Sequence, residues 1–149
     1  MNNNFLNNVI DSESIIIYTD GGSRGNPGIA GAGGVIIKDS KVIGEVSEYL
    51  GIQTNNYAEY SALILTLQKA ISMGINNQNI KVYMDSNLIV KQLNGEWKVK
   101  HKNIIPLFNS VKQIINSFKN ITFKHVYREH NKLADKLAND AMDSFNNKK

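Results

Sequence analysis

The chain has 149 residues, of which 42% are hydrophobic and 20% charged, with a formal net charge of +4 and no cysteine. This length suits one domain with one core, and the lack of cysteine excludes disulfides, thiolate metal sites and cysteine nucleophiles. No apolar run approaches the roughly 20 residues of a membrane helix, and the first residues lack the basic and apolar regions of a signal peptide. The composition therefore predicts a cytoplasmic domain without a membrane segment, and its mild positive charge suits a polyanionic partner.

Residue patterning predicts an asparagine-rich disordered leader at 1–13 and a single domain at 14–145. Strands are expected at 14–20, 33–38, 42–50, 80–84 and 121–126, with a glycine-rich loop at 21–31. Apolar residues at helical spacing predict helices at 57–73, 86–94, 103–118 and 131–145. In the last helix the expected inward side chains are Leu133, Ala134, Leu137, Ala138, Ala141 and Phe145. This order predicts a three-layer α/β domain with a five-stranded mixed sheet, in which the first three strands are antiparallel and the last two run parallel to the first.

The first strand carries the first candidate site residue. The run Ile15–Thr19 is apolar on both faces, which favours a central strand, and Asp20 follows it with two glycines. Taken alone, Asp20-Gly21 is also a strong signal for the turn of a hairpin with the apolar run 34–37. The position of three further acids favours a functional role for Asp20 over a turn.

These acids are expected to meet at one edge of the sheet. Asp85 ends the fourth predicted strand, so it converges with Asp20 if the two strands are parallel neighbours. Glu59 lies in the first turn of a helix, and Asp135 lies early in the last helix. Each also has an ordinary alternative: Glu59 as a charge at a helix N-terminus, Asp85 as a turn residue and Asp135 as a solvated charge on a helix face. Four adjacent carboxylates would repel one another, whereas Mg²⁺ or Mn²⁺ would neutralise them, and two such ions can drive phosphodiester hydrolysis.

Four segments, in their order along the chain, resemble those of type 1 ribonuclease H, and the resemblance extends over nearly all of residues 14–143. They are Tyr18–Gly28, Thr54–Glu59, Asp85-Ser86 and Arg128–Asp135. The resemblance implies a ribonuclease H-like fold and an endonuclease that cleaves the RNA strand of an RNA/DNA hybrid, leaving 5′-phosphate and 3′-hydroxyl ends.

The resemblance also implies how the acids divide the work between two Mg²⁺ ions, for which Mn²⁺ can substitute. Asp20 would bridge both ions. Asp135 would complete the site that orients the attacking water, whereas Glu59 and Asp85 would complete the leaving-group site.

Substrate contacts follow from the same resemblance. Asn55, Asn56 and Asn87 would read 2′-hydroxyls and base edges in the minor groove, although such asparagines are also common in loops and caps. Thr54 and Asn26 would hold a phosphate of the DNA strand.

The chain departs from the family pattern after the fourth strand. Only the segment 97–102 stands where some members carry a long basic helix, so hybrid binding is expected to be weaker and more sensitive to salt. Within it, Trp97 lines a DNA-strand channel or is a buried anchor.

Many members also carry a loop histidine, linked to product release, ten residues before the last acid. Here His125 has that spacing but lies in a predicted strand, which leaves Arg128 or His130 as candidates for the role, with a structural or exposed position as the alternative for both.

Three alternatives stay open at the level of the whole chain. The activity could extend to double-stranded RNA, the domain could bind hybrids without cutting them, or the acids could be scattered surface charges. A monomer is expected because one domain contains the whole site.

Overall fold

The computed structural model describes residues 14–147, so the predicted leader at 1–13 lies outside the described residues. Its elements are β1 (Ile15–Gly25), β2 (Gly28–Lys38), β3 (Lys41–Gln53), α2 (Asn55–Ser72), β4 (Asn79–Met84), α3 (Asn87–Leu93), α4 (Ile105–Ile115), β5 (Asn120–His125), η1 (Arg128–His130) and α5 (Lys132–Asn147). One sheet has the strand order β3-β2-β1-β4-β5. The β1–β2 and β2–β3 pairs are antiparallel, whereas β1–β4 and β4–β5 are parallel, which confirms the predicted mixed sheet.

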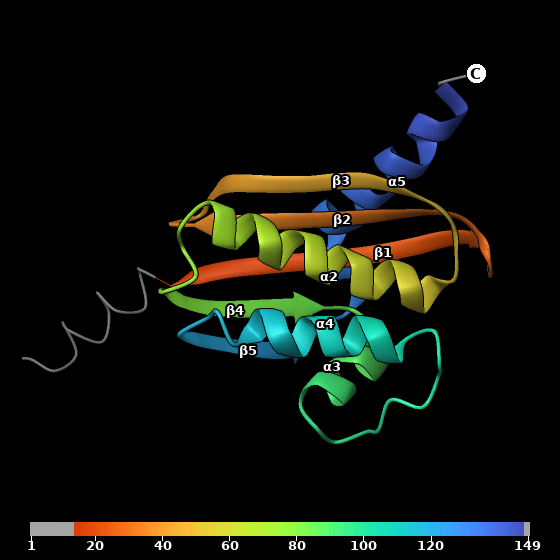
Figure 1. Cartoon of the computed structure of the whole chain (residues 1–149). Helices are drawn as coiled ribbons and strands as arrows, with labels where there is room; N and C mark the ends of the chain where they lie inside the picture. Colours follow the sequence, from red (N-terminus) through yellow and green to blue (C-terminus); the bar gives the residue numbers. More distant parts are fainter. Residues whose placement is uncertain (1–13, 148–149) are drawn as a thin grey trace, which may run out of the picture.

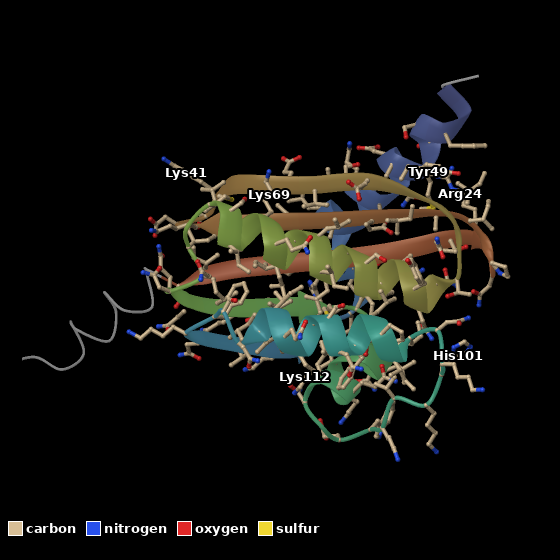
Figure 2. All side chains as sticks on the ribbon, viewed as in Figure 1. Arg24, Lys41, Tyr49, Lys69, His101 and Lys112 are labelled. Atoms are coloured by element: carbon tan, nitrogen blue, oxygen red, sulfur yellow. The ribbon has the colours of Figure 1, made fainter. Side chains whose placement is uncertain are left out.

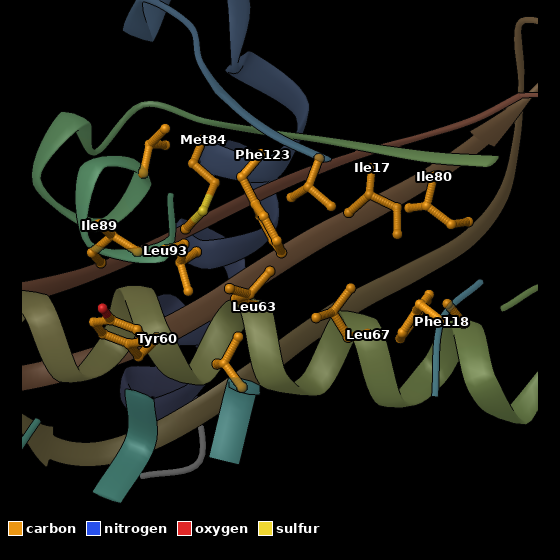
Figure 3. Close-up of a cluster of buried hydrophobic side chains, with 14 of the residues drawn as sticks. Ile17, Tyr60, Leu63, Leu67, Ile80, Met84, Ile89, Leu93, Phe118 and Phe123 are labelled. Carbon is orange, nitrogen blue, oxygen red and sulfur yellow. The ribbon is translucent and has the colours of Figure 1, made fainter. Parts of the chain in front are cut away.

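Helices cover both faces of this sheet (Figure 1). α2 and α4 pack together on one face, and α5 crosses the other face over β1, β2 and β3. Figure 3 shows the core between α2 and the sheet, where Leu63 and Leu67 of the helix meet Ile17, Ile80 and Phe123. No helix within residues 14–147 is long and apolar enough to cross a membrane.

The region predicted as a glycine-rich loop is instead a continuation of the β1–β2 hairpin. The turn lies at Asn26-Pro27, and Asp20 pairs with Gly33 inside the ladder, so the reading of Asp20-Gly21 as the turn is wrong. The glycines serve close packing: a Cβ on Gly33 would lie 2.1 Å from the Ala134 carbonyl oxygen of α5. Such a contact is too short for any side chain, so glycine lets the helix lie directly on the strand.

Side-chain caps fix the starts of two helices near the strand ends. The Thr54 hydroxyl accepts a hydrogen bond from the Tyr57 backbone N–H at 3.2 Å, and Ser86 accepts one from Ile89 at 3.3 Å. α2 and α3 therefore begin immediately after Thr54 and Ser86, close to the positions predicted for them.

Two predictions about the later helices need correction. α4 is shorter than predicted, because the backbone N–H groups of residues 116–118 bond three residues back and so tighten the chain after Ile115. In α5, Leu133 is 48% exposed and does not face inward. The small residues Ala134, Ala138 and Ala141 are buried as predicted, and α5 lies close to the glycines of β2 there.

Candidate active site

Asp20 and Asp85 meet because β1 and β4 are parallel neighbours. Thr19 of β1 is paired with Met84, the last residue of β4, so the next residue on each strand is an aspartate. This is the carboxyl end of β4 and the point at which its parallel pairing with β1 stops, and open α/β sheets place their sites at such an edge. The predicted convergence of these two carboxylates is confirmed.

Glu59 reaches the same edge from α2 because β1 carries a glycine there. A Cβ on Gly21 would lie 2.2 Å from the carbonyl carbon and oxygen of Ala58, so any other residue would push the helix away. The Gly21 backbone N–H donates a hydrogen bond of 3.0 Å to Glu59 Oε1. This bond fixes the carboxylate of Glu59 against the strand that carries Asp20.

The acids form a compact group at the floor of a cleft. One carboxylate oxygen each from Asp20, Glu59 and Asp85 lie within 4.8 Å of one another. Asp135, from the first turn of α5, lines the same cleft of about 500 Å³ but lies outside this tight group. The structure thus brings the four predicted acids to one cleft from four elements, with three of them in close contact.

Burial, together with the neighbouring carboxylates, raises the pKa values of the two buried members of this group. Asp20 and Glu59 are only 8% and 7% exposed. Burial raises the pKa of Asp20, and the nearby Glu59, Asp85 and Asp135 raise it further. Burial also raises the pKa of Glu59, although the Gly21 N–H and the positive charge of Arg128 act in the opposite direction. Ionising both carboxylates is therefore unfavourable in the metal-free protein, and a bound cation would offset that cost.

The residues present fit a divalent cation. Glu59 Oε2 is buried and has no hydrogen-bond partner among residues 14–147. Such an oxygen is costly to bury unless a donor or a cation satisfies it. A group of carboxylates without histidine or cysteine suits Mg²⁺ or Mn²⁺ better than softer metals.

The residues predicted to contact the substrate lie beside this cleft. Asn26, Thr54, Asn55 and Asn56 line a second cavity of about 370 Å³ together with His101 and Ile104. Figure 2 shows His101 on the connector after α3, at the same end of the sheet as the β1–β2 turn. Asn55 and Asn56 line both this cavity and the acid cleft, so the two hollows adjoin each other.

Their amides are not all free to bind a ligand. Asn26 Oδ1 accepts from the Asn55 backbone N–H at 3.1 Å, and Asn55 Oδ1 accepts from the Ser23 N–H at 2.8 Å. In the described part of the chain, the side chains of Asn56 and Asn87 make no hydrogen bond and are exposed. The side-chain oxygens of Asn26 and Asn55 thus have the structural role that is common for asparagines in loops. The side chains of Asn56 and Asn87 are available to a partner.

The two auxiliary candidates are separated by the structure. Arg128 lines the acid cleft, whereas His130 lines a different cavity with Tyr18 and Ile37. His125 is exposed at the end of β5, with its ring edge against Tyr127.

The predicted DNA-channel residue, Trp97, lies on the connector that follows α3. It is 48% exposed, so it is not a buried anchor.

Two residues of the site were not singled out from the sequence. Asn131 is 1% exposed and donates to Asp85 Oδ2 at 3.3 Å. Arg24 lines the cleft and forms an ion pair of 2.7 Å with Asp143. Asn131 stands one helical turn before Asp135, which is a weak signal, and nothing local in the sequence indicates the contact between Arg24 and α5.

The chain is similar to proteins that are named as ribonucleases H. A family model described as "Reverse transcriptase-like" matches residues 18–141. Ribonuclease H of Clostridium botulinum is 31% identical over 90% of this chain and 99% of its own length. Ribonuclease HI of Halobacterium salinarum is 38% identical over 85% of this chain and 63% of its own length. The bifunctional protein Rv2228c of Mycobacterium tuberculosis is 43% identical over 87% of this chain, which spans only 36% of that relative.

Solved structures give the same result. The N-terminal RNase H domain of Rv2228c has a TM-score of 0.82 at 43% identity and covers 87% of this chain and 98% of its own. LC11-RNase H1, a metagenomic protein from compost, in complex with an RNA/DNA hybrid has a TM-score of 0.83 at 43% identity, covering 87% of this chain and 97% of its own. With the mixed sheet and the acid cleft, these similarities establish that the chain belongs to the ribonuclease H family.

Proposed function

We propose that this chain is an endonuclease that hydrolyses the RNA strand of RNA/DNA hybrids with two Mg²⁺ ions, or Mn²⁺ in their place. The single observation that carries the proposal is the group formed by Asp20, Glu59 and Asp85, with the unpartnered Glu59 Oε2 in it. A relative with 43% identity is known in complex with an RNA/DNA hybrid. This combination favours a metal-dependent nuclease over a domain with scattered surface acids.

The four acids would hold the ions in distinct ways. Asp20 would contact both ions, Asp135 would hold the ion on the water side, and Glu59 with Asp85 would hold the ion on the leaving side. When bound, the ions supply an activated water and stabilise the developing charge. The water oxygen gives up a proton and bonds to phosphorus as the bond from phosphorus to the 3′-oxygen breaks. The 3′-oxygen takes up a proton from solvent, which leaves a 3′-hydroxyl and a 5′-phosphate.

The chain itself contributes rigid placement of charge. Glu59 is held by the Gly21 N–H, and Asp20 is fixed in the β1 ladder, so both are set before the substrate arrives. Preorganised charge of this kind is the main source of rate in phosphoryl transfer. Of the two auxiliary candidates, Arg128 is the better placed to aid product release, because it lines the acid cleft.

The polar surface beside the cleft is the proposed substrate contact. The free amides of Asn56 and Asn87 can donate to or accept from a 2′-hydroxyl, the group that distinguishes RNA from DNA. The cavity lined by Asn26, Thr54 and Asn55 suits a phosphate of the other strand. Trp97 is exposed and can stack against the DNA strand.

The test is cleavage of an end-labelled RNA/DNA hybrid with and without Mg²⁺, beside double-stranded RNA and double-stranded DNA of the same sequence. The proposal expects metal-dependent cuts in the RNA strand of the hybrid, with 5′-phosphate ends. Additional cutting of double-stranded RNA would widen the substrate class. Binding of the hybrid without cleavage in Mg²⁺ or Mn²⁺ would refute the nuclease and leave a binding module.

The monomeric state and the cytoplasmic location stay predictions from the sequence.

A further inference from the structure

Asn131 occupies an unusual position for an asparagine. It lies between η1 and α5 and is 1% exposed, although asparagine is mostly found at protein surfaces. Its side-chain Nδ2 donates to the Thr19 backbone oxygen at 2.9 Å and to Asp85 Oδ2 at 3.3 Å. Its burial is therefore linked to two groups at the edge of the acid cleft.

The side chain between these two partners has to donate hydrogen bonds to both of them. The Thr19 carbonyl and the Asp85 carboxylate both accept hydrogen bonds, so the side chain between them must offer N–H groups. An aspartate would add a further negative charge beside the acids, and a serine is too short and has a single O–H. The chemistry of the position thus selects an amide of this length.

The side chain of Asn131 does not cap the helix that follows it. An asparagine at a helix start commonly uses its side-chain oxygen to accept from the helix backbone. Here Asn131 Oδ1 has no partner within residues 14–147. Its backbone oxygen, by contrast, accepts from the Asp135 N–H at 3.1 Å and so begins α5.

Asn131 consequently joins the elements that carry three of the acids. Thr19 directly precedes Asp20 on β1, Asp85 follows β4, and Asp135 lies one turn into α5. Among carboxylates that repel one another, a donor to Asp85 restricts the orientations that this side chain can adopt. Groups that orient metal ligands in this way are worth about 10- to 100-fold in metal affinity or activity.

We propose that Asn131 is a positioning residue that holds Asp85 and the first turn of α5 in the arrangement that binds the metal. This inference rests on the proposed function, since it concerns the same acids. Asn131 does not contact the reacting atoms; it acts through Asp85 and through the placement of Asp135.

The test measures metal binding directly, apart from catalysis. Binding of Mn²⁺ to the full chain is followed by the loss of the electron paramagnetic resonance signal of the free ion. Asn131→Ala is expected to weaken Mn²⁺ binding by about 10-fold or more, to raise by a similar factor the Mg²⁺ concentration that gives half-maximal cleavage, and to leave the KM for hybrid at saturating metal unchanged.

The matched control is Gln92→Ala. Gln92 is also a buried amide, and its Oε1 accepts from the Tyr60 hydroxyl at 2.6 Å, in the core rather than at the cleft. This variant is expected to lower the melting temperature and to bind Mn²⁺ as the wild type does. If it weakens Mn²⁺ binding as much as Asn131→Ala, the effect is general loss of stability and the inference is wrong.

Asn131→Ser separates positioning from helix initiation. Serine is as good a residue as asparagine at a helix start, but it cannot bond Thr19 and Asp85 together, so Mn²⁺ binding should remain weak. Binding at the wild-type level in this variant, or in Asn131→Ala, would overturn the inference while wild-type cleavage still supported the proposed function. A wild type that neither binds Mn²⁺ nor cleaves the hybrid would instead refute the function itself.

Discussion

The acid cleft and the polar surface beside it are built in opposite ways. In the cleft, Asp20 and Glu59 are buried and held by the sheet and by a backbone hydrogen bond. On the neighbouring surface, Asn56 and Asn87 are exposed and have no hydrogen bond to the described chain. The fold thus fixes the position of the acids, whereas under the proposed function substrate choice would depend on side chains that can change without disturbing the fold. Substitutions in the cleft should therefore change both the cleavage rate and the stability of the protein. Substitutions on the surface should change only the preference for a ribose-containing strand.

The largest effect is expected for Asp20→Asn, which removes the acid at the centre of the cluster. Cleavage should fall by at least about 10³-fold, because the ions lose their shared ligand. Hybrid binding without metal should be largely unchanged, since the surface contacts remain. Single-turnover cleavage and binding in EDTA measure the two quantities, and cleavage at the wild-type rate would remove Asp20 from the metal site.

Gly21→Ala tests whether close packing builds the cleft. The added Cβ would meet the Ala58 backbone at 2.2 Å, so α2 must shift, at a cost of roughly 1–3 kcal/mol in the free energy of unfolding. Gly22→Ala is the matched control, because its Cβ would lie 3.5 Å from the Met142 Cε atom, an ordinary contact. Denaturant melts of both variants give the comparison, and equal stability of the two would show that the helix does not depend on this glycine.

The stability of the metal-free protein should depend on pH in an unusual direction. The pKa values of Asp20 and Glu59 are raised in the folded state, so the folded protein binds more protons than the unfolded one above about pH 4, the ordinary range of these groups. This contribution to stability is present at low pH and is lost as the pH rises through the raised values.

A melting series from pH 5 to pH 8 in EDTA should therefore show a decline that Asp20→Asn reduces and that millimolar Mg²⁺ opposes. At neutral pH the metal-free Asp20→Asn variant should melt above the wild type. A lower melting temperature for that variant would indicate a structural role for the charge.

The smallest effect is expected on the exposed surface. Asn56→Ala should reduce the preference for a ribose-containing strand by roughly 3- to 10-fold, the worth of about one hydrogen bond, with the melting temperature unchanged. Competition between the hybrid and double-stranded DNA of the same sequence measures it. An unchanged preference would remove Asn56 from the set of minor-groove contacts.

Local sequence signals identified the acids better than the packing around them. Asp20 and Asp85 each follow an apolar strand, and the rule that parallel strands present their carboxyl ends together was enough to bring them to one edge. The sequence predicts a loop for Gly21 and Gly31 because glycine signals both turns and close packing, and only the positions of α2 and α5 decide between these two roles. Helical spacing of apolar residues predicts an inward Leu133, whereas the structure leaves this side chain 48% exposed.

Individual side-chain hydrogen bonds between distant parts of the chain could not be predicted. Asn131 is bonded to Thr19 and Asp85, and its burial depends on how β1, β4 and α5 are assembled. The pattern around it indicates a helix start and nothing of these partners. Residues such as Asn131, which position a site residue through contacts with distant segments, are thus difficult to identify from a single sequence.

Whether the acids form one metal site is tested most directly with Mn²⁺. Crystals grown with Mn²⁺, measured at a wavelength where manganese scatters anomalously, locate the ions independently of activity. We expect strong peaks between the carboxylates of Asp20, Glu59 and Asp85, with Asp135 at the border of the site. A well-ordered structure with no manganese in the cleft, or with manganese bound only at surface acids such as Asp140, would contradict the account.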